Sequence, residues 1–310
     1  MKKFLIFCVV VGFVFALGNT AIASKWKVPG DFATIQDTID STDVLDGDTI
    51  LVGKGNHAGA LVTKAVEITG QGRAVINDGP HHPSGLIIGF RFLAGSDGAT
   101  ISHLAFEVDL AIMNGDAVND VTVDHCTFTN TLQAVSNWRG NGWQISHNVI
   151  TDLHTRNGGG IGILVGDYSG GIVKDNLISH NKIAGTLYVD PDDGGGYCGT
   201  GIVIFADFRW GAAGAEEISN NRVVKNKVRL ESNNTSVVPV VAFELTDTSN
   251  VGCDVIHDNS IGFNDFRGTE TQITLTPEEL NDCNDISRNL GDNRRGQDGL
   301  HPSVFGPGGN

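Results

Sequence analysis

Charged side chains that could take part in acid–base chemistry follow apolar runs in this sequence. Asp167 comes directly after one such run, and Asp207 and Arg209 follow a longer one. A pair of carboxylates can serve as general acid and general base in glycoside hydrolysis, and their separation decides the stereochemistry. A β-elimination instead needs a base and a cation that neutralises charge, for which Arg139 and Lys174 are further candidates. Asp167, Asp207 and Arg209 are therefore the candidate catalytic residues.

Acidic residues are also gathered among glycines in the stretch 190–198. Asp190, Asp192 and Asp193 offer the oxygen ligands that Ca²⁺ prefers, and long insertions on a regular scaffold often carry function. The spacing lacks the EF-hand pattern, however, and turns rich in Asp and Gly are common without any ion. A calcium site and a plain turn are both consistent with this stretch.

Aromatic and guanidinium side chains near these acids could contact a sugar. Aromatic rings can stack on sugar rings, although rings in such places can equally be buried anchors beneath the loops. The candidate ligand contacts are Trp138, Arg139, Tyr197 and Trp210.

Three histidines recur at a fixed interval along the chain. His103, His125 and His147 are spaced 22 residues apart, which places them at the same point of successive repeats. A column of imidazoles can bind a transition metal or carry protons. A column can equally be a hydrogen-bonded stack that supports a turn, because equivalent side chains of a repeat protein recur for packing reasons.

The elements that must position these groups form an internal repeat. Each copy has Ile or Val, then polar residues, a bend that is most often Asn, and a second apolar position. Asn adopts the left-handed backbone conformation of such a bend at low cost, and stacked amides can hydrogen-bond from one repeat to the next. The copies are 100–106, 122–128, 144–150, 172–178, 217–223, 255–261 and 285–291.

A second short apolar strand precedes each copy, so one repeat holds two or three strands and cannot bury its inner face alone. Stacking the repeats buries that face, with about 1.5–3 kcal/mol from each inward Ile, Val or Phe. Leucine-rich repeats would need a regular Leu framework, and a β-sandwich would show hairpin turns. The sequence predicts an all-β fold, a right-handed parallel β-helix over residues 24–293, followed by an irregular tail over 294–310.

The stretch 31–41 predicts a short helix at the N-terminal end of the stack. Phe32, Ile35 and Ile39 fall on one helical face, and Thr34 with Asp37 can form a capping box. Such a helix would cover strand edges that the first coil leaves unpaired.

Residues 1–23 have the order of a secretory signal peptide. Lys2 and Lys3 precede an apolar run over 4–17, and Ala21 and Ala23 form a small-residue cleavage motif. A membrane anchor is the alternative, but the run is shorter than the roughly 20 residues that a bilayer requires. We expect a secreted or periplasmic monomer with no membrane span after cleavage.

The whole chain is acidic, with 21 Lys and Arg against 36 Asp and Glu and a net charge of −15. Phosphate binding requires clustered positive charge, so nucleic acid is excluded as an expected partner. By the same reasoning, an uncharged or cationic glycan fits better than a uronate, unless Ca²⁺ bridges the like charges.

Two of the cysteines that follow the signal peptide are expected to form a disulfide. Cys253 and Cys283 each lie six residues before a bend asparagine, which predicts equivalent positions on adjacent coils. Adjacent coils lie about 4.8 Å apart, within the range of Cα separations that a disulfide tolerates. An oxidising compartment favours the bridge, and two stacked free thiols are the alternative.

The opening of the chain, together with the asparagine repeats, resembles the pectin lyase-like superfamily of right-handed parallel β-helices. The similarity starts with the segments 28–36, 46–52 and 66–70. The segment 123–128 is similar to the W-I-D-H-C-S-F stretch of pectate lyases, with Val in place of Trp. The catalytic R-x-P-x-x-R segment of those lyases is absent, as are the polygalacturonase and pectin methylesterase signatures. The resemblance implies a fold and carries over no named activity.

In that superfamily the substrate groove lies along the first strand of the coils. Acids on neighbouring coils, about 4.8 Å apart, could bind Ca²⁺ or hold a raised pKa, or they could form a plain solvated face. The resemblance implies a protein that binds, and cleaves or modifies, an extracellular polysaccharide; the alternative is a non-catalytic protein that binds glycans or protein partners. The polar and aromatic residues expected on this face are Asn114, Asp116, Trp138, Arg139, Asp167, Asp207, Arg209, Trp210, Glu244 and Asp247.

Overall fold

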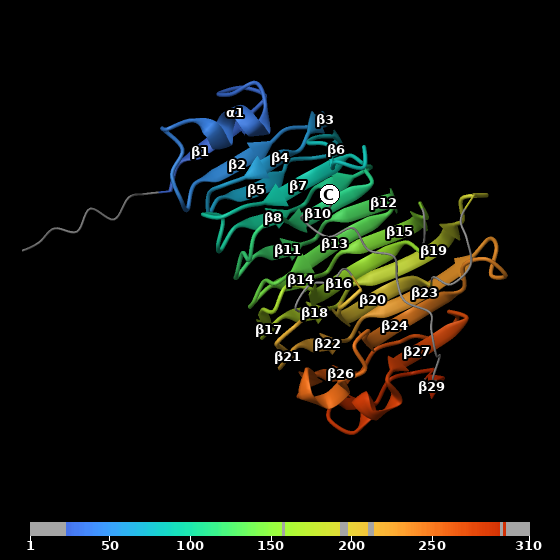
Figure 1. The fold of residues 1–310 in the computed structure, drawn as a ribbon. Coiled ribbons are helices and arrows are strands. Elements are labelled where there is room, and N and C mark those ends of the chain that lie inside the picture. Colours follow the sequence, from blue (N-terminus) through green and yellow to red (C-terminus); the bar gives the residue numbers. More distant parts are fainter. Residues whose placement is uncertain (1–22, 157–158, 193–197, 210–213, 292–293, 296–310) are drawn as a thin grey trace, which may run out of the picture.

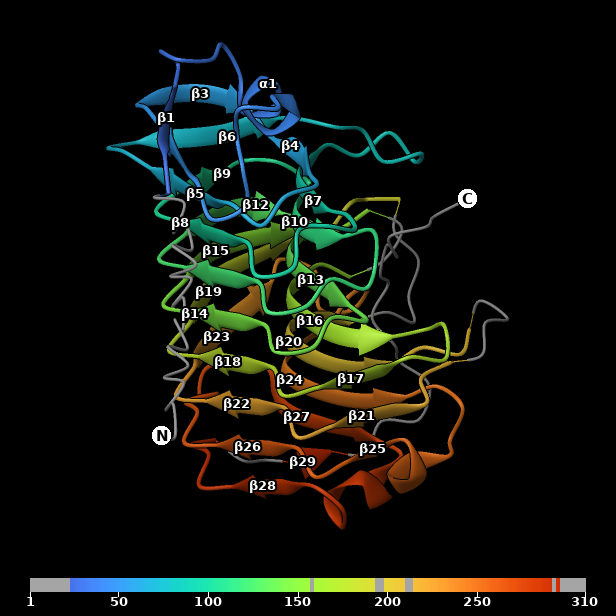
Figure 2. The same cartoon turned by 90° about the vertical axis from the view of Figure 1, so that its left-hand side faces the viewer.

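The computed structural model describes residues 23–156, 159–192, 198–209, 214–291 and 294–295. Its strands run in parallel within long sheets, and successive coils stack into the predicted right-handed parallel β-helix (Figure 1). Over residues 49–247 the chain passes in each turn from a ten-stranded sheet to a seven-stranded sheet and on to a nine-stranded sheet, whereas the last two turns, over 260–276 and 285–295, have no described strand in the seven-stranded sheet. Figure 2 shows the ten-stranded sheet along one side of the stack.

The strands of each sheet are given in the order in which they pair. The ten-stranded sheet contains β1 (Lys25–Val28), β2 (Thr49–Val52), β5 (Glu67–Gly70), β8 (Thr100–Ser102), β11 (Thr122–Asp124), β14 (Gln144–Ser146), β18 (Leu177–Ser179), β22 (Arg222–Val224), β26 (Ser260–Gly262) and β28 (Asp285–Ser287). The nine-stranded sheet contains β4 (Ala60–Val62), β7 (Ile88–Phe92), β10 (Leu110–Asn114), β13 (Gln133–Trp138), β16 (Ile161–Asp167), β20 (Gly199–Ala206), β24 (Val240–Asp247), β27 (Thr271–Thr276) and β29 (Arg294–Arg295). The seven-stranded sheet contains β3 (Gly55–Ala58), β6 (Ala74–Asp78), β9 (Ala105–Phe106), β12 (Thr127–Thr131), β15 (Val149–His154), β19 (Lys182–Tyr188) and β23 (Lys227–Ser232). A small sheet contains β17 (Ile172–Lys174), β21 (Glu217–Ser219) and β25 (Ile256–His257).

The core is built from columns of aliphatic side chains that run the length of the stack. One column follows the middle position of the ten-stranded sheet, where each residue pairs with its equivalent on the next coil and is buried. Such side chains have no contact with water, so their burial is the main stabilising contribution to the stack. The members of the column are Ile50, Ile68, Ile101, Val123, Ile145, Ile178, Val223, Ile261 and Ile286.

The predicted asparagine bends exist, but the sequence assigned their register wrongly. β14 pairs with β18, so the backbone N–H of Asn148 donates to the side chain of Asn181, at 3.0 Å, and not to that of Asn176. A second ladder passes through Asn176, whose N–H donates to Asn221. The first ladder contains Asn148, Asn181, Asn226, Asn264 and Asn289, and the second contains Asn176, Asn221, Asn259 and Asn284.

The left-handed residue of each bend is also not the asparagine that the sequence suggested. It is the residue before it, such as His147, with φ 54°, which precedes Asn148. Asn148 is free to serve the ladder: its Nδ2 donates to the carbonyl of Val123 at 2.9 Å. In each bend of the first ladder, an outward residue with positive φ turns the chain and the buried asparagine that follows it ties the coils together.

The N-terminal end is covered by the predicted helix, α1 (Ile35–Asp40). The Oγ1 of Thr34 accepts a hydrogen bond from the backbone N–H of Asp37 at 3.0 Å, which caps the first turn. Ile35 and Ile39 are fully buried against the first coils. No helix in the described part of the chain is long and apolar enough to cross a bilayer.

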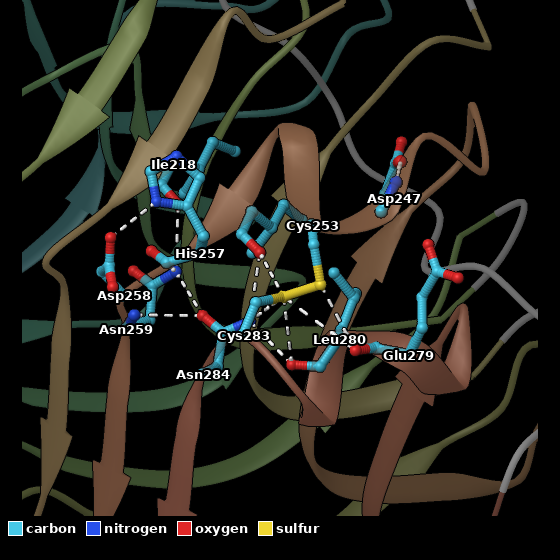
Figure 3. The surroundings of a disulfide bond; sticks show 12 residues. Ile218, Asp247, Cys253, His257, Asp258, Asn259, Glu279, Leu280, Cys283 and Asn284 are labelled. Atoms are coloured by element: carbon cyan, nitrogen blue, oxygen red, sulfur yellow. Dashed lines mark hydrogen bonds and ion pairs between the residues drawn. A yellow bond between two sulfur atoms is a disulfide. The ribbon is translucent and has the colours of Figure 1, made fainter.

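The C-terminal coils carry the predicted Cys253–Cys283 disulfide, with a Cα separation of 5.8 Å (Figure 3). The reason given for it was wrong, because Asn259 pairs with Asn284 and the two cysteines are not equivalent positions. They meet because two short 3₁₀ helices, η1 (Gly252–Asp254) and η2 (Glu278–Asn281), lie beside each other. Cys126 and Cys198, the other two cysteines among the described residues, are buried.

Candidate functional site

The outer surface of the nine-stranded sheet is here called the closed face. Near the start of β24, two consecutive residues, Ala242 and Phe243, belong to the core, and the equivalent pair in β13 is Ala134 and Val135. The first position of the pair is small: a Cβ on Gly201 would lie 2.6 Å from the carbonyl oxygen of Ala242. The residues that flank the pair in β24, Val241 and Glu244, lie outside this core cluster and belong to the closed face.

Most of the closed face is apolar and buried. One cluster covers the coils around β16, and Trp138 belongs to it with none of its surface exposed. Its indole packs edge to face on Tyr168 at 5.2 Å, so the structure places Trp138 as a buried anchor. Arg139 lies beside it, donating to the carbonyl of Gly115 at 3.0 Å, with its guanidinium 5.5 Å from the ring of Tyr168.

The closed face becomes polar around β24, near the C-terminal end of the stack. Glu244 in β24 is the one acidic residue among the outward positions of the described strands there. It is 1% exposed, and the hydroxyl of Thr200 donates to its Oε2 at 3.1 Å. Its Oε1 has no hydrogen-bond partner among the described residues. Burial raises the pKa of Glu244 to about 7, against the opposing effects of the Thr200 and Thr246 hydroxyls and of the Arg209 charge.

Asp207 and Arg209 form an ion pair near the carboxyl group of Glu244. Arg209 donates from Nε to Oδ1 of Asp207 at 2.9 Å and from Nη2 to Oδ2 at 3.0 Å. Asp207 is fully buried, and the guanidinium lies 5.0 Å from the ring of Phe205. Both carboxylate oxygens of Asp207 therefore accept hydrogen bonds from Arg209, as in a bidentate ion pair.

The other predicted acid, Asp167, serves the turn that leaves the sheet. Its Oδ2 accepts from the backbone N–H of Ser169 at 3.0 Å and of Gly171 at 2.7 Å. Asp247 does the same for a later turn, accepting from the N–H groups of Ser249 and Gly252. These buried carboxylates satisfy loop N–H groups, so they form turn caps and not the continuous ladder of acids that the sequence suggested.

Only part of the stretch 190–198, the candidate calcium site, lies within the residues that the structure describes. Asp190 and Asp192 are exposed, and Oδ1 of Asp190 accepts from the N–H of Asp192 at 3.0 Å, as in a plain turn. Asp193, Tyr197 and Trp210 lie outside the described residues.

The opposite surface, the outer side of the ten-stranded sheet, is accessible and is here called the open face. Over its C-terminal coils it forms a shallow depression of about 600 Å³. Small residues form its floor, while cations and an exposed phenylalanine line it; Arg288 lies 5.2 Å from the ring of Phe263. The residues concerned are Ser179, His180, Arg222, Lys225, Ser260, Gly262, Phe263, Asp285, Ser287 and Arg288.

Sequence reasoning missed this depression, although a signal for it exists. The residue before each asparagine of the first ladder has positive φ and is exposed. The same holds for the equivalent residues before Leu104 and Cys126, which aligns one column of side chains along the corner. Reading that position in the correct register gives four histidines, then a lysine, a phenylalanine and an arginine. The column is His103, His125, His147, His180, Lys225, Phe263 and Arg288.

No family model matches this sequence, and no curated protein does. Similar solved structures include an alginate lyase from a Paenibacillus species, at 13% identity over 90% of this chain and 98% of that one, with a TM-score of 0.38. A GH87 α-1,3-glucanase catalytic domain shows 12% identity over 91% of this chain and 68% of that one, with a TM-score of 0.34. The A-module of an Azotobacter vinelandii mannuronan C-5 epimerase shows 14% identity over 87% of this chain and 95% of that one, with a TM-score of 0.31. At such scores these similarities carry no argument about activity. The observed coil itself is the right-handed parallel β-helix that the sequence resemblance implied.

Proposed function

We propose that this protein is exported and binds an acidic extracellular polysaccharide along the open face. The observation that carries the proposal is the depression on that face, where three cations lie exposed on an otherwise acidic protein. Arg222, Lys225 and Arg288 form no ion pair with an acid among the described residues. One acid, Asp285, lies among them, so the local charge is positive.

The regular geometry of the stack fits a polymer better than a small molecule. The lining residues repeat on β18, β22, β26 and β28, so equivalent positions recur about every 4.8 Å along the stack. Phe263 adds an exposed apolar ring, 56% accessible, of the kind that stacks on a sugar. The local charge replaces the earlier expectation, drawn from net charge alone, of an uncharged or cationic glycan.

Equilibrium binding to a uronate polymer tests the proposal. We expect the mature chain to bind polyuronate, and affinity to fall as salt rises, because exposed charges are screened beyond about 8–10 Å at physiological ionic strength. The variant Arg222→Glu/Lys225→Glu/Arg288→Glu should lose binding while keeping its melting temperature. Equal binding by this variant would remove the open face as the site.

A second candidate function, catalysis on a polysaccharide, is favoured by Glu244. A carboxyl that is half protonated near pH 7 and has an unpaired oxygen is suited to donate or accept a proton, and Arg209 adds a nearby positive charge. Because Glu244 is buried, this role requires the closed face to be uncovered when a substrate binds. Turnover of a panel of neutral and acidic polysaccharides by wild type, but not by Glu244→Gln, is the expected result; turnover by both would exclude Glu244.

A further inference from the structure

We propose that Asp124, His125 and His147 form a binding site for one divalent transition-metal ion. Nδ1 of His125 lies 2.5 Å from Oδ2 of Asp124, and Nδ1 of His147 lies 3.0 Å from its Oδ1. The three ligand atoms all lie within 4.8 Å of one another. None of these three residues lines the depression on the open face, although His147 stacks on His180, which does. The metal site does not depend on the proposed binding of a polysaccharide.

The stack holds these side chains in place through its backbone register. β11 and β14 pair so that Asp124 is opposite Ser146, which places His125 and His147 at the same point of adjacent coils. Both histidines have positive φ, 51° and 54°, and their rings are nearly parallel, with centroids 4.9 Å apart. Two ligands on neighbouring paired strands need no backbone rearrangement to share an ion.

The donor set indicates which ions would bind. Two imidazoles and one carboxylate suit Zn²⁺, Ni²⁺, Co²⁺ or Cu²⁺, whereas Ca²⁺ and Mg²⁺ prefer oxygen ligands throughout. Ligand atoms of a tetrahedral zinc site with bonds of about 2.0–2.1 Å lie about 3.3–3.4 Å apart. The two nitrogens, which lie within 4.8 Å of each other, must therefore approach by at most about 1.5 Å, and the carboxylate–nitrogen contacts of 2.5 and 3.0 Å must open by less than about 1 Å. Small rotations of exposed side chains supply such a movement, and water would complete the coordination.

The surroundings favour a charged carboxylate with a route for the ion. Ser146 donates from Oγ to Oδ1 of Asp124 at 2.8 Å, which fixes the orientation of the carboxylate. Burial acts to raise the pKa of Asp124, but hydrogen bonds from His125, Ser146 and His147 outweigh it and hold the pKa below its ordinary value. The side chains of His125 and His147 are 53% and 47% exposed, so an ion can reach them from solvent.

Metal binding changes the tautomer of each imidazole. In the chain without metal, a neutral ring donates its Nδ1 proton to the carboxylate. Coordination through Nδ1 requires that proton to leave, and Nε2 takes one up from water, so two neutral histidines bind an ion with no net release of protons.

The same column provides a matched control. His103 stacks on His125 with ring centroids 5.4 Å apart, and His180 stacks on His147 at 5.0 Å. Within the described residues, however, Asp124 forms ion pairs with His125 and His147 alone. If Asp124 defines the site, substitution of His125 or His147 should weaken metal binding, and substitution of His103 or His180 should not. An unspecific column of imidazoles would instead predict a similar loss of affinity for all four substitutions.

Isothermal titration of the untagged mature chain with Zn²⁺ and with Ni²⁺ tests the site. We expect one ion per chain and at least a tenfold weaker affinity in His125→Ala, in His147→Ala and in Asp124→Asn. His103→Ala should stay within about twofold of wild type, because it lacks the carboxylate contact. Co²⁺ should give visible absorption bands in wild type and in His103→Ala, and these bands should be absent in His125→Ala.

Two results would overturn the proposal. One is the absence of saturable binding to wild type at millimolar metal. The other is an equal loss of affinity in His103→Ala and His125→Ala while both variants keep the wild-type circular dichroism spectrum. Since the circular dichroism shows whether a variant has folded, a misfolded His125→Ala is replaced by His125→Gln, for which the same tenfold loss is required.

Discussion

The closed face and the open face belong to the same coils but have opposite environments. On the closed face, Trp138 and Glu244 are at most 1% exposed. On the open face, Arg222, Lys225 and Arg288 are exposed around a shallow depression. A parallel β-helix fixes the inward residues by packing and leaves the outward ones free to vary, so one scaffold can present two different chemistries.

The difference decides what a charged group can do. On the closed face, loss of hydration disfavours a charge, so burial raises the pKa of Glu244 to about 7. On the open face, the charged side chains are exposed to water and salt, so they can contact an anionic ligand without losing hydration to burial. Recognition by charge therefore belongs to the open face, and a proton with a shifted pKa belongs to the closed face.

The largest effect that we expect from the difference between the faces is on the free energy of unfolding when one aromatic ring is removed from each face. Trp138→Ala should lower the free energy of unfolding by about 3–5 kcal/mol, because it opens a cavity in a packed cluster. Phe263→Ala, at a ring that is 56% exposed, should change it by less than about 0.5 kcal/mol. Urea unfolding of both variants gives the comparison. Similar losses in the two would mean that the faces do not differ in burial.

The next test uses the pH dependence of stability. The pKa of Glu244 is raised from 4.5 to about 7 in the folded chain, so between these values the folded state binds more protons than the unfolded state. The neutral carboxyl thus makes its full contribution to stability below pH 4.5. As the pH rises to about 7, this contribution to the free energy of unfolding, about 3 kcal/mol, is lost.

Glu244→Gln keeps the shape and removes the charge, so it should abolish this loss. The free energy of unfolding of the variant should rise relative to that of wild type from about pH 4.5 upward, and this difference should level off above about pH 7. Unfolding curves at a series of pH values measure it. A constant difference across that range would mean that the pKa of Glu244 is not raised.

The coil itself was predictable from the sequence, because each coil must place an Ile or Val in the core, so these residues recur along the chain. The register was not, because Asn176 and Asn181 lie five residues apart and each fits a bend. Only strand pairing shows that the ladder from Asn148 continues through Asn181. The disulfide was predicted correctly from a register that does not exist, since Cys253 and Cys283 meet through the packing of η1 and η2.

The candidate site was harder to predict, because a sequence gives residue types but not the partners of each lone pair. Asp167 was predicted as a catalytic acid and Asp247 as an acid of the substrate face. Each is followed two residues later by a serine, and each carboxylate accepts a hydrogen bond from the backbone N–H of that serine. That Asp-x-Ser pattern is a signal for a turn. Glu244 is also followed two residues later by a hydroxyl residue, Thr246, but it lies within β24 and caps no turn, and its Oε1 has no hydrogen-bond partner among the described residues.

The smallest expected effect concerns a single charge on the open face. Lys225→Gln should weaken binding of a polyuronate about threefold, since one exposed ion pair contributes about 0.2–1 kcal/mol. The matched control is Lys174→Gln, which removes an equally exposed lysine from β17, outside the depression. Affinity measured at low salt and at 1 M salt should differ between the variants only at low salt, because the screening length falls to about 3 Å at 1 M. If Lys174→Gln weakened binding as much, the attraction would come from overall charge, and the depression would not be its source.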